Sequence, residues 1–81
     1  MRVTIRLFAK LHDLAGASEF GRDLPAGATA EDAWKVIVAD HPAMASYSSA
    51  ISCAVNASYV KLNRSLAEGD EVVFMPPVSG G

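Results

Sequence analysis

The fold follows from the sequence Thr29-Ala30-Glu31-Asp32-Ala33-Trp34-Lys35-Val36-Ile37-Val38, which has the period of one amphipathic α-helix. Its apolar face consists of Ala30, Ala33, Trp34, Ile37 and Val38. Thr29 is a suitable N-cap, and Asp32 three residues later can complete a capping box with it. Pro42 disfavours a helical conformation of the residue before it and so ends the helix. Trp34 is expected to fill the space between this helix and a sheet.

Strand patterns lie on both sides of the helix. Residues 2–8 alternate, with Val3, Ile5 and Leu7 toward the core, whereas Phe8 is an aromatic residue on the opposite, otherwise polar face. A loop is expected over residues 11–17, and residues 19–24 are predicted to form the second strand of a hairpin. C-terminal to the helix we expect a surface loop over residues 42–49 and strands over residues 51–55, 58–62 and 71–75.

This order of elements predicts one α+β domain. One main helix packed on one face of a mixed sheet is the economical arrangement of these segments, and the β-grasp (ubiquitin-like) fold fits it. In such sheets the first and last strands are parallel neighbours. We therefore expect a β-grasp domain over residues 1–75 and an extended C-terminal tail over residues 76–81.

The composition limits the possible partners. The 81 residues have 51% hydrophobic and 20% charged content and a formal net charge of -2, which is typical of one small globular domain. Binding of nucleic acid is not expected, because it needs a basic surface. No apolar run approaches the roughly 20 residues that span a bilayer, and the N-terminus lacks the pattern of a signal peptide. These features predict a cytoplasmic protein that binds neither nucleic acid nor a membrane.

Few residues within the domain suggest chemistry. The single Cys53 lies in an apolar strand, where we expect it to be buried, and one cysteine makes no persuasive zinc site. His12 and Asp13 are adjacent, but neighbours in sequence seldom form a catalytic dyad. The sequence has no Gly-rich phosphate loop and no evident nucleophile–base pair. We therefore expect no metal and no cofactor on this chain, and no catalysis by the chain alone.

The tail is the most informative segment for function. No charged side chain follows Glu71, and the chain ends Pro76-Pro77-Val78-Ser79-Gly80-Gly81. The two prolines favour a stiff extended backbone, so these residues reach on the order of 20 Å. Glycine lets a partner approach closely, and an uncharged tail costs little to desolvate in a channel. The tail is thus either an ordinary frayed terminus or an arm that delivers the Gly81 carboxylate to another protein.

A carboxylate must be activated before it can react as an electrophile. Attack of the Gly81 carboxylate on the α-phosphate of ATP would give an acyl-adenylate with AMP as leaving group, and a sulfur nucleophile would convert it to a thiocarboxylate. Because this chain lacks a phosphate loop, the ATP chemistry is expected to belong to a nucleotide-binding partner.

The segment Met75-Pro76-Pro77-Val78-Ser79-Gly80-Gly81, preceded by Gly69-Asp70-Glu71-Val72, resembles the C-terminus of molybdopterin synthase small subunits. These belong to the MoaD/ThiS group of ubiquitin-like sulfur carriers. The resemblance spans the whole chain and includes Ala54-Val55-Asn56, Leu66, Phe8-Ala9 and Leu14-Ala15-Gly16. Where many relatives carry an aromatic residue, this chain has Met75.

The resemblance implies a function for the tail and three partners. An E1-like, zinc-containing adenylyltransferase would adenylate Gly81, and a sulfur donor protein would supply the sulfur. The thiocarboxylated tail would then enter the large synthase subunit and donate sulfur to cyclic pyranopterin monophosphate in molybdenum cofactor biosynthesis. The expected assembly is a heterotetramer of two small and two large subunits.

The predicted strands add a docking surface. Phe8, Tyr59, Val73 and Met75 all fall on the sheet face away from the helix, where a chain without partners should be polar. We interpret these four residues as a partner-binding patch beside the tail, although scattered apolar surface residues are common. Three other functions remain open: a sulfur carrier of the thiamine pathway, a ubiquitin-like protein modifier, and an interaction module with an inert tail.

Overall fold

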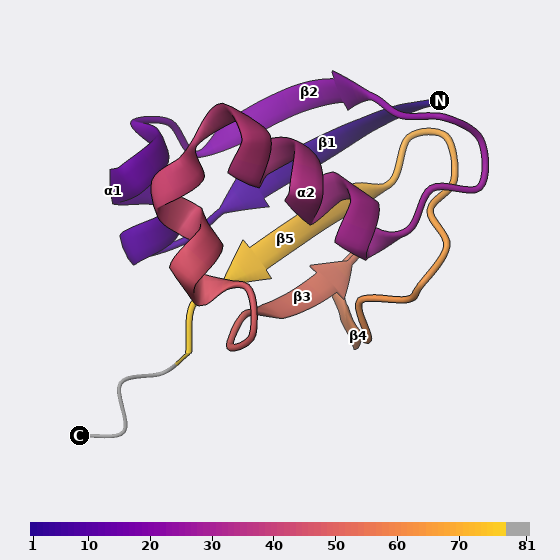
Figure 1. The fold of residues 1–81 in the computed structure, drawn as a ribbon. Helices are drawn as coiled ribbons and strands as arrows, with labels where there is room; N and C mark the ends of the chain where they lie inside the picture. The colour runs from indigo at the N-terminus through magenta and orange to yellow at the C-terminus, as the bar shows by residue number, and fades with distance from the viewer. Residues whose placement is uncertain (78–81) are drawn as a thin grey trace.

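The computed structural model describes residues 1–77, which form a five-stranded mixed sheet with helix α2 (Ala30–Asp40) across one face (Figure 1). The strands are β1 (Arg2–Leu7), β2 (Glu19–Asp23), β3 (Ser52–Val55), β4 (Ser58–Val60) and β5 (Glu71–Met75). Their spatial order is β2-β1-β5-β3-β4. Strands β1 and β5 pair in parallel, and the other pairs are antiparallel. The mixed sheet and the parallel pairing of the first and last strands are as the sequence predicted.

The predicted helix forms, and its predicted cap forms with it. The Thr29 hydroxyl accepts a hydrogen bond from the Asp32 backbone N–H at 3.3 Å, and the Asp32 carboxylate accepts one from the Thr29 N–H at 2.9 Å. This reciprocal pair satisfies two of the N–H groups that a helix start leaves without intrahelical partners. The carboxylate also gains from these bonds, which hold the pKa of Asp32 below its usual value.

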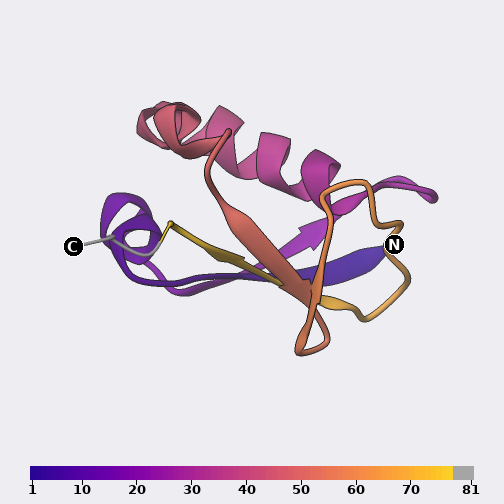
Figure 2. The same ribbon diagram turned by 90° about the horizontal axis from the view of Figure 1, so that it is seen from below.

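The core lies between α2 and the sheet, which form the two layers visible in Figure 2. Trp34 is 3% exposed and meets the ring of Phe74 edge-on, with the ring centroids 5.2 Å apart. Its indole N–H donates to the Ser48 hydroxyl at 2.9 Å, so the polar atom of this core residue is satisfied. The structure thus confirms Trp34 as the residue that fills the space between helix and sheet.

Two segments expected to be loops are helical instead. Helix α1 (Lys10–Ala15) replaces the first loop, and Leu11 within it is completely buried. A 3₁₀ helix, η1 (Pro42–Tyr47), replaces the second, and Met44 within it is also completely buried. Each segment has one completely buried apolar side chain, and Leu14, Ala15 and Tyr47 also pack against the core. A short sequence pattern does not reveal these contacts. Among residues 1–77 no helix is long and apolar enough to cross a membrane.

Strand β4 is also shorter than predicted, because it ends at Val60 and not at Leu62. The carbonyl of Lys61 accepts a hydrogen bond from the Arg64 N–H at 3.1 Å, which turns the chain out of the sheet.

Candidate functional site

Strand pairing places the predicted patch residues on one face of the sheet. Val73 lies opposite Arg6 of β1 and Ala54 of β3, and Ala54 in turn lies opposite Tyr59 of β4. Outward-facing residues of neighbouring strands therefore form a row across the face that α2 does not cover. One step further along the strands, the Phe8 N–H donates to the Phe74 carbonyl at 3.2 Å, which extends the parallel pairing to the end of β5.

The patch residues differ widely in exposure. Tyr59 is 78% exposed and Phe8 is 44% exposed, whereas Met75 is half-buried and Val73 is only 8% exposed. The Tyr59 hydroxyl points to the Met75 sulfur at 4.0 Å, which links the far edge of the sheet to the strand that carries the tail. Val73 lies on the predicted face but offers little surface, so in the free chain the accessible part of the patch is Phe8, Tyr59 and Met75.

Arg6 is the polar residue within this patch, and sequence reasoning did not single it out. Its guanidinium lies 5.8 Å from the centroid of the Phe8 ring and 3.8 Å from a carboxylate oxygen of both Glu19 and Glu71. Its Nε is buried and has no hydrogen-bond partner among residues 1–77. These two carboxylates more than neutralise the single positive charge of Arg6. The sequence Arg6-Leu7-Phe8 could have indicated this, because Arg6 and Phe8 alternate with the core residue Leu7 and so lie on the same face.

Strand β5 leads from this patch into the tail. Pro76 is half-buried and Pro77 exposed, and neither can extend the ladder, because proline has no backbone N–H to donate. The remaining predicted tail residues, Val78, Ser79, Gly80 and Gly81, lie outside the described residues. The structure therefore shows where the tail begins, at the end of the sheet that also carries Phe8.

A cavity of about 530 Å³ lies beside the root of the tail. Its walls come from three separate segments: the end of β1 with the start of α1, the end of η1, and the start of the tail. The lining residues are Phe8, Ala9, Lys10, Tyr47, Met75, Pro76 and Pro77. We call it the tail-root pocket. Sequence reasoning missed Tyr47, because the segment that carries it had no interpretable pattern.

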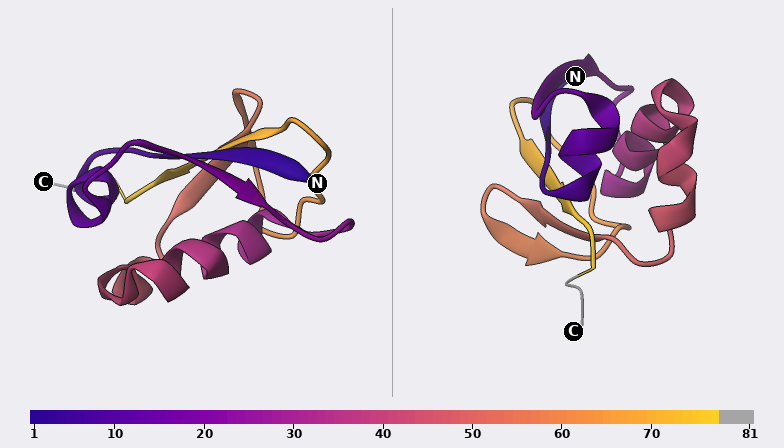
Figure 3. Two further views of the ribbon diagram at one scale, coloured as in Figure 1. Left: turned by 90° about the horizontal axis from the view of Figure 1, so that it is seen from above. Right: turned by 90° about the vertical axis from the view of Figure 1, so that its left-hand side faces the viewer.

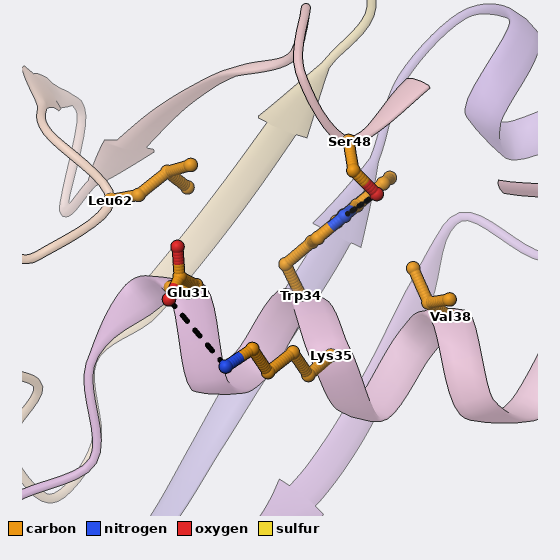
Figure 4. Close-up of a pocket in the computed structure, with 6 residues that line it drawn as sticks. All are labelled: Glu31, Trp34, Lys35, Val38, Ser48 and Leu62. Atoms are coloured by element: carbon orange, nitrogen blue, oxygen red, sulfur yellow. Dashed lines mark hydrogen bonds and ion pairs between the residues drawn. The ribbon is translucent and has the colours of Figure 1, made fainter. Parts of the chain in front are cut away.

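A second hollow, of about 240 Å³, lies beside α2 (Figure 4). Glu31, Trp34, Lys35, Val38, Ser48 and Leu62 line it. The Glu31–Lys35 ion pair of 3.6 Å and the Trp34–Ser48 hydrogen bond are internal to it (Figure 4). Its polar groups therefore already satisfy one another, and no predicted site residue lines it.

The remaining candidate groups, His12, Asp13 and Cys53, form no catalytic or metal-binding arrangement among residues 1–77. His12 and Asp13 lie on exposed turns of α1 with 3.4 Å between Nδ1 and Oδ1, which pairs them but leaves both in solvent. Cys53 is 2% exposed, as predicted, and this burial raises the pKa of its thiol. Within residues 1–77 no three His, Cys, Asp or Glu side chains gather in a way that could hold a metal ion.

Comparisons with known proteins agree with this geometry. The ThiS family matches residues 5–81. A molybdopterin synthase sulfur carrier subunit from Chlamydomonas reinhardtii is 39% identical over 83 residues, with 100% of both chains covered. The Homo sapiens protein of the same name is 34% identical, with 99% of this chain and 94% of that protein covered.

Among solved structures, the crystal structure of the small archaeal modifier protein 1 of Haloferax volcanii superposes with a TM-score of 0.82 at 30% identity. The superposition covers 95% of this chain and 98% of that one. This match confirms the ubiquitin-like β-grasp fold, and the family match covers both the patch and the whole tail. The chain belongs to the ThiS family.

Proposed function

We propose that this chain is the sulfur carrier subunit of a molybdopterin synthase. The observation that carries the proposal is the course of β5, which runs beneath an exposed apolar patch and directly into the Pro76-Pro77 stem. A partner that binds Phe8, Tyr59 and Met75 thereby receives the tail in a fixed direction. The full-length similarity to molybdopterin synthase sulfur carrier subunits supports the same function.

The reactive group in this proposal is the carboxylate of Gly81. One of its oxygens attacks the α-phosphorus of ATP, pyrophosphate leaves, and the acyl-adenylate forms. A sulfur nucleophile then displaces AMP to leave a thiocarboxylate. The chain catalyses neither step alone. The ATP site belongs to an E1-like adenylyltransferase, and the sulfur comes from a donor protein.

The loaded tail then serves the large subunit of the synthase. We propose that Val78, Ser79 and Gly80 lie inside a channel of that subunit, while the patch holds the globular domain at the channel entrance. Sulfur passes from Gly81 to cyclic pyranopterin monophosphate. Two copies of this chain bind a dimer of large subunits, which makes a heterotetramer. Because loading of the chain consumes ATP, we also propose a cytoplasmic location.

A second candidate function is a protein modifier, in which the activated Gly81 forms an amide with a lysine of a target protein. The fold match to a small archaeal modifier protein favours this possibility. Both functions use the same adenylated terminus, and they differ in the nucleophile that attacks it.

Intact-mass analysis after incubation with the adenylyltransferase, ATP and a sulfur donor separates the two. The mass of a carrier rises by the difference between one sulfur atom and one oxygen atom. Fragmentation then places this change on the peptide that contains Gly81. A modifier appears in higher-mass conjugates that survive reducing agent. An unchanged mass under conditions that load a known carrier would contradict both functions.

A further inference from the structure

The tail-root pocket has no role in the function proposed above. It lies at the end of the sheet where β1 and β5 both finish, between α1 and η1. The right-hand view of Figure 3 faces this end of the molecule and shows α1, η1 and the start of the tail together. The pocket therefore lies at the edge of the sheet, next to the outer sheet face. Phe8 and Met75 belong both to the pocket and to the patch on that face.

The walls of the pocket are apolar, with one positive group. Tyr47, Phe8, Met75 and the two prolines present rings and a thioether, whereas Lys10 adds an ammonium group. Lys10 forms no ion pair with any residue in the range 1–77. By contrast, Lys35 on α2 is paired with Glu31 at 3.6 Å. The pocket thus combines apolar walls with a cation that the described residues leave without a counter-ion.

The backbone at Ala9 supports the view that this wall is built for contact. Ala9 has φ 54° and ψ -127°, a conformation that only glycine adopts without strain. Hydrogen bonds on both sides hold it: Leu11 N–H to the Phe8 carbonyl at 3.1 Å, and Asp13 N–H to the Ala9 carbonyl at 3.2 Å. The sharp turn places the side chains of Phe8 and Lys10 on the same pocket. Such strain tends to collect at binding sites, where the surrounding structure maintains it.

We propose that the tail-root pocket receives a segment of the tail-accepting subunit that presents a bulky apolar side chain next to a carboxylate, and that Lys10 pairs with that carboxylate. This inference rests on the proposed function, since its occupant is part of the protein that holds the tail. A protein that encloses Pro76 and Pro77 must pass over this pocket, because both prolines form its wall. The shared residues Phe8 and Met75 make the pocket continuous with the patch.

The chemistry of the lining selects this occupant. Burial of the apolar walls against a partner removes apolar surface from water and so favours binding. A pocket of this size suits an aromatic or branched aliphatic side chain. A charged residue at the rim of an apolar contact contributes through complementary charge and through the rate of association. A basic segment would be repelled by Lys10, and a purely polar segment would make no use of the apolar walls.

The test measures the affinity of the full chain for the purified large subunit by calorimetry. Lys10→Met removes the charge but keeps an unbranched side chain, and Lys10 is exposed, so the fold should be kept. We expect binding to weaken about five- to tenfold at low salt, with Lys10→Glu weaker still. In about 0.5 M NaCl the difference between wild type and Lys10→Met should shrink toward twofold, because salt screens the ion pair. Lys35→Met, an exposed lysine on α2 outside the pocket, is the matched control and should bind as wild type does.

Tyr47→Ala tests the apolar wall, and a thermal melt shows whether the variant is folded. If it folds, we expect about tenfold weaker binding that does not depend on salt. If it does not fold, the Lys10 series decides alone. Lys10→Met binding with wild-type affinity at low salt would overturn the inference. So would an effect of Lys10→Met on dimerisation of the free chain, which would mean that a second copy fills the pocket.

The free chain itself supplies one more control. If nuclear Overhauser effects in the free chain join protons of residues 78–81 to the side chains of Tyr47 or Lys10, the chain's own tail occupies the pocket, and the inference is wrong. Its failure can be distinguished from failure of the proposed function. A wild-type chain that does not bind the large subunit contradicts the function, whereas wild-type binding that the Lys10 and Tyr47 variants fully retain contradicts only the pocket.

Discussion

Replacement of Tyr59 by alanine should weaken binding to the large subunit far more than it lowers the stability of the free chain. Tyr59 is 78% exposed, and its hydroxyl contacts only the Met75 sulfur, at 4.0 Å, among the hydrogen-bond partners within residues 1–77. Its neighbour across the β3–β4 pair is the small Ala54. The free chain therefore buries little of this ring.

The exposed fraction sets the size of the expected effect. A tyrosine side chain offers on the order of 200 Å² for burial, so the 78% exposed in the free chain corresponds to about 150 Å². At about 25 cal/mol per Å², complete coverage by a partner contributes about 4 kcal/mol, and half coverage about 2 kcal/mol. The expected loss of affinity is therefore about 30-fold or more. Stability should fall by about 1 kcal/mol or less, from lost strand propensity and the small buried area.

Affinity is measured by calorimetry with the large subunit, and the free energy of unfolding by urea titration. Tyr59→Phe is the first control, because it keeps the ring and should bind within about twofold of wild type. Val38→Ala on α2 is the second, because it removes apolar atoms from the other layer of the fold. If Tyr59→Ala bound with wild-type affinity, or lost more in stability than in binding, the assignment of the outer face as a docking surface would be refuted.

Three further predictions concern the domain itself. Asp70 accepts hydrogen bonds from the Ala67 N–H and the Asn56 side-chain amide, which hold its pKa below the usual 3.8. As pH falls, the Asp70 carboxylate takes up a proton at higher pH in the unfolded chain than in the folded chain. The stabilisation by Asp70 is therefore present above pH 3.8 and is lost as pH falls below that value. When pH is lowered from about 5 to about 3, Asp70→Asn should lose less stability than wild type does. Ala57 has φ 72° in the turn between β3 and β4, a conformation that glycine adopts more readily than alanine. Ala57→Gly should therefore raise the free energy of unfolding by about 0.5 kcal/mol. A lower free energy of unfolding would show that Ala57 is not strained. Cys53 should react with a thiol reagent much more slowly in the folded chain than in urea, and equal rates would contradict its burial.

The parts of the fold that sequence predicts well depend on local chemistry or on long patterns. The capping box of Thr29 and Asp32 needs only two residues at a fixed spacing, and it forms as expected. The alternation in residues 2–8 and 71–75 is long enough to assign faces, so Phe8 and Met75 appear on the predicted side. Their proximity followed from the expected parallel pairing, which needs the fold and not the pattern alone.

The missed elements are short and depend on tertiary contacts. Helix α1 has six residues, too few to be stable alone, and it forms because Leu11 inserts into the core. Met44 has the same role in η1. The tail-root pocket needs both helices and the tail together, so no sequence pattern could reveal that Tyr47 and Lys10 lie near Pro77. The low exposure of Val73 likewise depends on its neighbours across the sheet, which alternation does not describe.

The most direct test of the proposed function is reconstitution with purified large subunit and cyclic pyranopterin monophosphate. Three versions of the chain are compared, each first incubated with the adenylyltransferase, ATP and a sulfur donor. The wild type should form molybdopterin, whereas deletion of Gly81, or addition of one residue after it, should abolish product and leave the thermal melt unchanged. Undiminished product from either altered terminus would contradict the claim that the Gly81 thiocarboxylate is the group that delivers sulfur.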